Sequence, residues 1–411
     1  VEKIDIGGPT MIRAAAKNHA HVMVVVDPAD YPEVLRALAG EVAEEEVSEM
    51  RRKLAWKAFQ HCASYDSQVA EWMWNQVGGG EPAPEKSVPM QLLQGLRYGE
   101  NPHQPAAFYT DYSLAEVGMG GVARAVVHWG KEMSYNNYLD TDAAYNAVVD
   151  FDEPACVIVK HTNPCGAAVK GDLLEAYRLA VIADPISAFG GIVAFNRTVD
   201  ADLAREIREF RSPTDGETRM FYEIVVAPLY TEEGLEVLKG KSKALRILEA
   251  PPRKSGGSGL RQVGGGWLAQ TTDSITPADV TFTCVSEKQP TEQNMEDIKV
   301  AWNIVKHVKS NAITIAKDGR LLGMGSGQPN RVKSVEIAME KADTQGGAGG
   351  AALASDAFFP FSWGDSVEKA CQAGVAVIAH PGGSMRDQDA VDCCNKYGVV
   401  LLTTGIRHFR H

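Results

Sequence analysis

Several features that would assign this chain to a common class of protein are missing from it. No apolar run in its 411 residues is long enough to cross a bilayer, and the longest ones, such as VVLLTTGI, have the length of strands. The start of the sequence, VEKIDIGGPTM, lacks the basic and apolar segments of a secretory signal. We therefore expect no membrane span.

Positive charge is scarce as well. The chain has 41 lysine and arginine residues against 53 aspartate and glutamate residues, which gives a formal net charge of -12. It has neither a basic arm nor a cluster of lysine and arginine, so the attraction on which nucleic-acid binding depends is lacking. We expect no nucleic-acid partner, and any phosphate must be bound by a few local cations.

Three motifs of nucleotide and metal chemistry are also absent. There is no GxxxxGK[ST] phosphate loop, and Gly325 and Gly327 lack the third glycine of a dinucleotide-binding GxGxxG. Cys165 follows a proline, as in zinc-dependent deaminases, but no cysteine lies three positions later and no HxE precedes it. The sequence gives no support to a nucleoside triphosphatase, a dinucleotide enzyme or a zinc-activated water.

Cysteine is present, but without the spacing of a disulfide framework. The seven cysteines are an odd number, which in a chain of this length favours reduced, mostly structural thiols in the cytoplasm. The composition, with 45% hydrophobic and 23% charged residues, is that of a soluble globular protein. A length of 411 residues predicts two or three domains.

Two breaks rich in glycine and proline divide the chain into three parts, 1–85, 86–265 and 266–411. The first break is VGGGEPAPEKSVP, and the second is PPRKSGGSGLRQVGGG, which is flexible by composition. The first part predicts a helix over MIRAAAKNH, a buried strand over HVMVVVD (His21 to Asp27) and long amphipathic helices to about Gln76.

The other two parts have the alternating strands and helices of an α/β fold. ACVIVKH and GGIVAFN predict strands, and LEAYRLAVI predicts a helix. NAITIAKDGRLLGMGSG predicts a hairpin with a DG turn, and AVIAHPGG and VVLLTTG predict strands separated by a helix. The similar lengths of the two parts indicate a duplicated architecture, although no strong sequence repeat accompanies it.

Two places combine side chains that suit a binding or catalytic site. LRYGENPHQ places Arg97, Tyr98 and His103 in a short non-periodic loop. Lys160 and His161 close an apolar strand just before a turn, where ligands gather in α/β folds. We expect a buried pair, in which burial and the neighbouring cation both favour proton loss, so that the two residues could exchange protons at neutral pH. The alternative interpretation of this pair is a salt-bridged strand end.

Other candidates have equally ordinary alternatives. Asn311 precedes the strand AITIAKD and could donate to a developing oxyanion, or simply cap a helix. The phenylalanines of SDAFFPF could line an apolar ligand pocket or belong to the core. Arg97 and Arg407 suit phosphate, although most surface arginines are solvated.

Taken together, these segments resemble the 5-aminoimidazole-4-carboxamide ribonucleotide (AICAR) transformylase family of purine biosynthesis. Its blocks occur in family order over nearly the whole chain: LRYGENPHQ, SYNNYLDTDAA, VKHTNPCGAAV, DPISAFGGIVAFNR, KSNAI, GSGQPNRV, SDAFFPF, PGGSMRD and IRHFRH. The resemblance implies an α/β fold of two tandem cytidine-deaminase-like three-layer subdomains. A remnant of an α/β inosine monophosphate (IMP) cyclohydrolase domain and a helical linker would precede them.

The resemblance also implies a role for each candidate residue. Catalysis falls to Lys160, His161 and Asn311. AICAR is bound by Arg97, Tyr98, His103, Asn137, Gly190, Glu223, Phe358 and Arg407, although some family members have aspartate at the position of Glu223. The folate is bound by Arg331, Pro360, Phe361 and Asp365. Asp356 and His411 match the neighbours of a structural potassium ion, or form a plain salt bridge.

The expected reaction is formyl transfer from 10-formyltetrahydrofolate to AICAR, without a prosthetic cofactor, in a cytoplasmic homodimer with shared active sites. Asp5 and Lys17 match positions of the cyclohydrolase site, whose other residues would lie upstream, so we expect no cyclohydrolase activity from this chain alone. The alternatives are another folate-dependent one-carbon transferase, which would change the acceptor, and a non-catalytic scaffold, which would not need Lys160 or His161.

Overall fold

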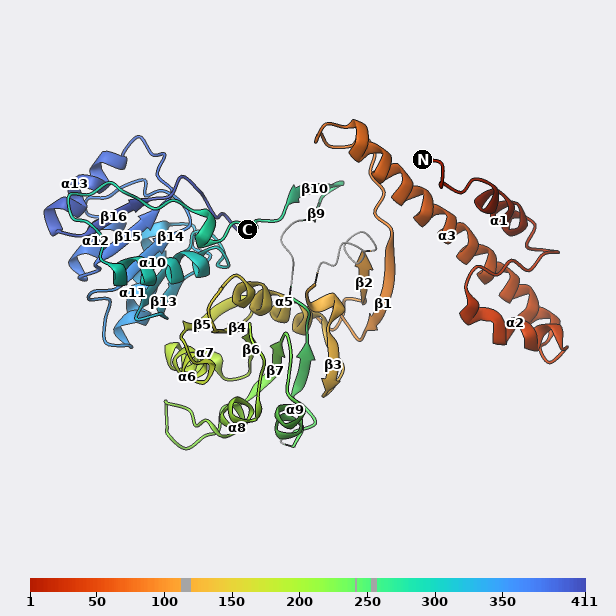
Figure 1. Cartoon of the computed structure of the whole chain (residues 1–411), viewed down its shortest axis with the longest axis horizontal. Coiled ribbons are helices and arrows are strands. Elements are labelled where there is room, and N and C mark those ends of the chain that lie inside the picture. The colour runs from red at the N-terminus through yellow and green to blue at the C-terminus, as the bar shows by residue number, and fades with distance from the viewer. Residues whose placement is uncertain (112–119, 241, 253–256) are drawn as a thin grey trace. The chain divides into compact units, whose positions relative to one another are not determined.

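The computed structural model describes residues 1–111, 120–240, 242–252 and 257–411. Within these residues the chain forms two compact units (Figure 1). The first contains residues 1–94 and 109–111, and the second contains residues 95–108 and the described residues from 120 to the C-terminus. In the described part of the chain, no helix is both long enough and apolar enough to span a membrane.

The first unit is built mainly from helices. They are α1 (Gly7–Lys17), the short 3-10 helix η1 (Pro28–Asp30), α2 (Tyr31–Leu38) and the 34-residue α3 (Glu44–Val77). Three glutamates in the first turn of α3 complement the positive end of its dipole. Small side chains, Ala16 of α1 with Ala55 and Ala58 of α3, let the two helices pack closely.

The predicted strand from His21 to Asp27 is wrong. This segment is extended but unpaired with any strand among the described residues, and Val24 and Val26 pack instead against the α1–α3 cluster. A strand needs a neighbouring strand for its backbone N–H and C=O groups, which the apolar pattern alone does not supply. The long helix predicted up to Gln76 is confirmed by α3.

Two small hairpins lie outside the larger sheet, one before its strands in sequence and one between its two halves. β1 (Met90–Leu96) and β2 (Ala106–Asp111) form one two-stranded sheet. β9 (Ser258–Val263) and β10 (Gly266–Thr271) form the other, and β9 lies within the break that was predicted to be flexible. That prediction is wrong for this stretch, because Gly264 and Gly265 form a two-residue turn of the kind that favours hairpins. Residues 253–256 of the break lie outside the described residues.

A twelve-stranded mixed sheet forms the core of the second unit. Its first half contains β3 (Val126–Trp129), β4 (Ala155–Lys160), β5 (Asn163–Val169), β6 (Gly191–Phe195), β7 (Tyr222–Ala227) and β8 (Arg246–Glu249). Its second half contains β11 (Thr283–Cys284), β12 (Ile313–Lys317), β13 (Arg320–Gly325), β14 (Ala352–Ser355), β15 (Val377–His380) and β16 (Val400–Thr403). The predicted DG hairpin is confirmed by β12 and β13.

The two halves of the sheet have the same topology. Each begins with an edge strand, β3 or β11, followed by an antiparallel hairpin, β4–β5 or β12–β13. Three parallel strands, β6–β7–β8 or β14–β15–β16, complete each half. The halves meet where β5 pairs with β13, at Ala168 and Arg320. The duplicated architecture expected from the part lengths is therefore present in the sheet.

Helices cover both faces of this sheet. α5 (Tyr135–Val149) and α10 (Glu292–Val305) share one hydrophobic cluster with both halves of the sheet. On the other face, α6 (Leu173–Ala183), α7 (Pro185–Ala188), α8 (Ala201–Glu209) and α9 (Glu232–Lys239) follow strands of the first half. α11 (Arg331–Asp343), α12 (Ser366–Gln372) and α13 (Asp387–Tyr397) do so in the second half. Short 3-10 helices, η2 (Val122–Arg124) and η3 (Pro277–Asp279), complete the unit.

Candidate active site

Lys160 and His161 lie at the tight turn between β4 and β5. His161 and Thr162 both have positive φ angles, 52° and 60°, so the chain reverses here in an uncommon backbone conformation. The backbone N–H of Thr162 donates to Oδ1 of Asp140 in α5 at 2.7 Å, and Nζ of Lys160 donates to the carbonyl oxygen of Phe189 at 2.6 Å. These contacts fix the turn from two neighbouring elements.

The turn is more open than the sequence suggested. Lys160 is partly exposed and His161 is exposed, so the expectation of a buried pair is wrong. Both residues follow the last buried position of β4, where the chain leaves the sheet. The pKa of Asp140 is raised, because the effect of burial outweighs two opposing effects. These are the hydrogen bond from Thr162 and the charge of His161, which both lower the pKa. A carboxyl group that sequence analysis missed thus faces the histidine.

A row of hydrogen bonds joins this turn to Asn311. Asn163 donates from Nδ2 to the carbonyl oxygen of His161 at 2.8 Å, and its Oδ1 accepts from the hydroxyl of Ser326 at 2.7 Å. Gln328 donates from Nε2 to the carbonyl oxygen of Ser326 at 3.1 Å, and its own carbonyl oxygen accepts from Nδ2 of Asn311 at 2.8 Å. Residues from both halves of the sheet therefore meet at one site.

Asn311 is connected onward to a buried ion pair. Its Oδ1 accepts from Nη2 of Arg331 at 2.7 Å, and Nη1 of Arg331 contacts Asp356 and donates to the hydroxyl of Ser355 at 2.9 Å. Asn311 is not a helix cap, because α10 ends at Val305 and Lys306 is its C-cap. Arg331 is 7% exposed, so in this chain its guanidinium orients Asn311 rather than facing solvent.

The loop with Arg97, Tyr98 and His103 lies near the N-terminal end of α5. Asn136 donates from Nδ2 to the carbonyl oxygen of Glu100 at 3.3 Å, and Phe108 stacks on Tyr138 with ring centroids 4.3 Å apart. Arg97 and His103 are exposed. Nη2 of Arg97 donates to the hydroxyl of Tyr98 at 2.8 Å.

The other predicted AICAR contacts lie on several different segments of the chain. Asn137 closes a capping box with Ser134 at the start of α5 and donates from Nδ2 to Glu223 at 2.8 Å. Gly190 has a φ of 75°, and a Cβ added there would lie 3.6 Å from Nζ of Lys160. Arg407 is exposed near the C-terminus, with its guanidinium 4.2 Å from the ring centroid of Phe409.

The SDAFFPF segment combines a core residue with exposed aromatic ones. Phe359 is 2% exposed, whereas Phe358 and Phe361 are 39% and 53% exposed. Pro360 is exposed as well. Asp365 caps α12, with Oδ1 accepting from the backbone N–H of Ser366 at 2.6 Å. The segment leaves apolar surface of the kind that a flat heterocycle would cover.

The two expected potassium neighbours differ in their surroundings. Asp356 is fully buried and pairs with Arg331, while the backbone N–H that reaches its carbonyl oxygen belongs to His408. His411 is exposed, and its ring packs edge-to-face against Phe409. The second carboxylate oxygen of Asp356 is buried without a hydrogen-bond partner, so Asp356 fits a cation neighbour, but an Asp356–His411 salt bridge is not formed.

The two residues matched to the cyclohydrolase site belong to the first unit. Asp5 accepts from the backbone N–H of Gly8 at 3.0 Å, and its own N–H donates to the hydroxyl of Tyr65 at 2.7 Å. Lys17 is exposed in the last turn of α1. Asp5 thus lies just before α1, and Lys17 is its last residue.

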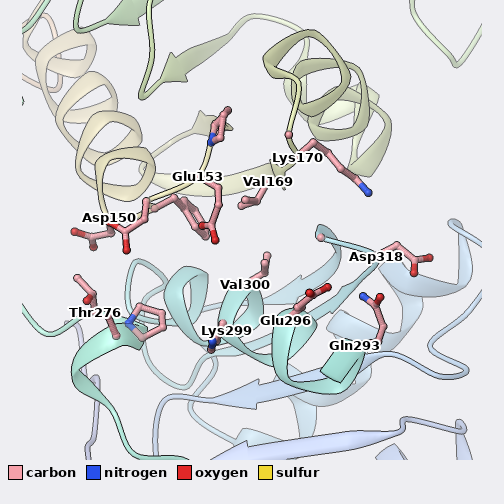
Figure 2. A pocket seen from close by; sticks show the side chains of 17 residues that line it. Asp150, Glu153, Val169, Lys170, Thr276, Gln293, Glu296, Lys299, Val300 and Asp318 are labelled. Atoms are coloured by element: carbon pink, nitrogen blue, oxygen red, sulfur yellow. The ribbon is translucent and has the colours of Figure 1, made fainter. Parts of the chain in front are cut away.

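Two cavities open where the halves of the sheet meet. One, of about 630 Å³, is lined by Lys160, His161, Asn163, Ser326 and Gln328, among others, and so follows the hydrogen-bonded row. The other, of about 660 Å³, contains no predicted site residue. Figure 2 shows its lining, with Asp150 and Glu153 opposite Thr276 and Lys299.

Comparison with known proteins gives the family of the chain. Residues 15–341 match the family model described as AICARFT/IMPCHase bienzyme. The chain belongs to this family. It is similar to the bifunctional purine biosynthesis protein PurH of Bacillus cytotoxicus, at 47% identity over 417 residues, which cover all of this chain and 77% of that protein. The PurH protein of Bacillus cereus strain AH820 is also 47% identical, over 416 residues and with the same coverage.

Membership of the AICARFT/IMPCHase family confirms the family predicted from the sequence. It also confirms the enzyme class and the AICAR transformylase function in purine biosynthesis. Among solved structures, Acinetobacter baumannii RibD matches with a TM-score of 0.19 and 17% identity, over 26% of this chain and 33% of that chain. A likeness of that size carries no argument about the site.

Proposed function

We propose that this chain transfers the formyl group of 10-formyltetrahydrofolate to the 5-amino group of AICAR at the Lys160–His161 turn. The observation that carries the proposal is the hydrogen-bonded row from His161 to Asn311, which assembles one polar site from both halves of the sheet. An assay with AICAR and with other aminated nucleotides tests it. Turnover of a different acceptor in preference to AICAR would support the alternative of another one-carbon transferase.

The chemistry requires positioning and timely proton removal. The acceptor amine is a poor nucleophile, because the imidazole ring and the carboxamide delocalise its lone pair. His161 takes the amine proton, directly or through the substrate carboxamide, and its exposed position allows that contact. Lys160 protonates the departing folate nitrogen or stabilises the tetrahedral oxyanion.

Asn311 supplies a neutral donor to the same oxyanion. An asparagine amide has two N–H donors, and the hydrogen bond to the Gln328 carbonyl uses one of them. The second can then point to the transferring formyl group without a change in the side-chain position. Arg331 holds the Oδ1 side of the amide, so the orientation of Asn311 is set before substrate binds.

Arg97 and Arg407 are proposed to bind the AICAR phosphate, with Tyr98 beside it. Replacing either arginine with leucine should weaken AICAR binding by roughly 1.5–3 kcal/mol, the contribution of a charge-assisted hydrogen bond, and leave folate binding unchanged. Calorimetric titration with each ligand measures this. An exposed arginine of similar setting, Arg205, is the control. Loss of folate affinity instead would show that the phosphate-binding and folate-binding parts of the pocket were exchanged in this assignment.

The site is further proposed to be shared across a homodimer. The long helix α3 exposes Trp56, Phe59 and Trp72, which are large apolar side chains that a second copy would cover. In the family the loop with Arg97 and Tyr98 reaches the partner's Lys160 and His161. Each site would then need both chains.

Mixing two defective variants tests the shared site. Arg97→Leu and His161→Ala subunits should restore up to about a quarter of the normal activity after exchange, because half of the dimers are mixed and each has one intact site. The assay uses AICAR at a concentration at which Arg97→Leu alone is inactive. The absence of rescue after demonstrated subunit exchange, or full activity in a monomer by light scattering, would refute the shared site.

Several finer assignments belong to this proposal. We assign 1–85 to a cyclohydrolase remnant with a helical linker, and 86–265 and 266–411 to two cytidine-deaminase-like subdomains, supported by the equal topology of the two halves of the sheet. Asp356 is proposed to neighbour a structural potassium ion, supported by its unpartnered carboxylate oxygen. A cytoplasmic location is supported by seven free cysteines.

A further inference from the structure

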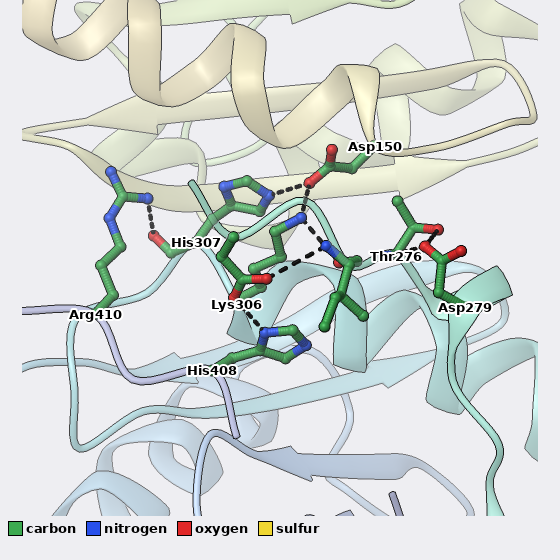
Figure 3. Close-up of polar contacts among 9 residues, drawn as sticks. Asp150, Thr276, Asp279, Lys306, His307, His408 and Arg410 are labelled. Atoms are coloured by element: carbon green, nitrogen blue, oxygen red, sulfur yellow. Dashed lines mark hydrogen bonds and ion pairs between the residues drawn. The ribbon is translucent and has the colours of Figure 1, made fainter. Parts of the chain in front are cut away.

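A buried cluster of charged groups lies away from the Lys160–His161 turn, where α5 ends. Oδ2 of Asp150 accepts from Nζ of Lys306 at 2.8 Å and from Nε2 of His307 at 2.7 Å (Figure 3). Lys306 also donates to the carbonyl oxygen of Ile275 at 2.9 Å. Asp150 follows the last residue of α5, and Lys306 follows the last residue of α10, so the cluster ties the two helices together.

The protonation states of these groups favour a stable contact. Burial lowers the pKa of His307, with Lys306 and Arg410 acting in the same direction and Asp150 opposing them. The imidazole is therefore neutral at pH 7 and donates its Nε2–H to Asp150. Burial alone would raise the pKa of Asp150, but His307 and Lys306 hold it below its ordinary value. Oδ2 of Asp150 therefore has two donors, one of them from a buried counter-charge.

From this cluster, hydrogen bonds continue to Asn311. The carbonyl oxygen of His307 accepts from Nη1 of Arg410 at 3.1 Å, and the carbonyl oxygen of Arg410 accepts from the backbone N–H of Ser310 at 2.9 Å. Asn311 is the next residue. The segment between α10 and β12 is thus held at its start by Asp150 and near its end by the C-terminal tail.

The opposite end of α5 holds the other part of the site. Oδ1 of Asp140, in the second turn of this helix, accepts from Thr162 beside His161. Hydrophobic packing keeps the helix rigid between its ends, since Tyr145 and Val148 are fully buried. One helix therefore contacts the Lys160–His161 turn near its N-terminal end and the segment leading to Asn311 at its C-terminal end.

We propose that Asp150 is a positioning residue for formyl transfer, which fixes Asn311 relative to His161 through Lys306, His307 and α5. The inference rests on the proposed roles of His161 and Asn311. Asp150 itself does not touch the substrate, since it contacts Lys306 and His307 and lines the other cavity. Displacing a catalytic group by about 1 Å can lower turnover by about 10²-fold, so a tether of this kind affects rate without affecting binding.

Turnover measurements in two backgrounds test the proposal. Asp150→Ala should lower kcat by about tenfold or more and leave the KM values for AICAR and 10-formyltetrahydrofolate within about twofold. In an Asn311→Ala background, the same substitution should lower kcat further by less than about twofold, because the group being positioned is gone. Asp152→Ala is the matched control, since Asp152 is exposed and lines the same cavity. It should leave kcat unchanged.

A second variant covers the case in which Asp150→Ala does not fold. Asp150→Asn combined with Lys306→Met removes both charges and leaves neither one buried alone. It should give the same loss of kcat with unchanged KM values. A normal kcat in either folded variant would overturn the positioning role. So would an Asp150→Ala substitution that lowers kcat by the same factor in the Asn311→Ala background as in the native enzyme.

The same set of variants separates this inference from the proposed function. If Asn311→Ala lowers kcat and the Asp150 variants do not, only the positioning role is wrong. If Asn311→Ala itself has normal kcat, the proposed role of Asn311 is wrong, and the role of Asp150 fails with it.

Discussion

Replacing His161 with alanine is expected to lower kcat by at least about 10²-fold, the lower part of the range for a lost general base. The side chain is exposed at the end of β4, so its removal leaves the packing of the sheet unchanged. Binding of both substrates should therefore survive, and the loss should appear in kcat rather than in KM.

Steady-state kinetics with each substrate varied in turn measure this effect. His61→Ala is a suitable control, because His61 is also exposed but lies on α3, in the other unit. Added imidazole should restore part of the lost turnover in His161→Ala, since it can accept the same proton. A His161→Ala enzyme with near-normal turnover would contradict the mechanism, even if the family assignment stands.

Local sequence patterns predicted the individual strands and turns of this site well. The apolar run before Lys160 and the Pro and Gly residues after it place the pair at a strand end, where the structure has it. The DG turn likewise predicted the β12–β13 hairpin. Both predictions succeeded because turn chemistry and strand periodicity depend on a few neighbouring residues. The strand at His21 to Asp27 failed, since pairing depends on a partner that no local pattern reveals.

Contacts between distant segments could not be predicted in this way. Asn163 and Ser326 are brought together because β5 and β13 join the two halves of the sheet. Neither segment has a sequence pattern that indicates which strand it pairs with. Asp140 and Asp150 were missed because their partners lie on other elements. Arg331 was assigned to the folate from the resemblance, whereas its burial against Asp356 became visible only in the structure.

That buried pair leads to the largest expected effect on stability. Asp356 is fully buried and Arg331 nearly so, and the guanidinium also contacts Ser355 and Asn311. Asp356→Ala would leave the guanidinium buried without its counter-charge, which costs about 3–5 kcal/mol of unfolding free energy. Urea denaturation followed by circular dichroism measures the loss. Glu236→Ala, which breaks an exposed pair with Lys239, should cost less than about 1 kcal/mol.

A double variant distinguishes the loss of a counter-charge from the loss of packing. Arg331→Met with Asp356→Leu replaces the pair with apolar side chains of similar size, and such replacements of buried ion pairs are often neutral or stabilising. Its unfolding free energy should exceed that of Asp356→Ala by at least about 2 kcal/mol. Formyl transfer should nevertheless stay low, because Asn311 has lost the guanidinium that orients its amide. Equal stability of the single and double variants would show that the cost comes from packing around Asp356 and not from the unpaired charge.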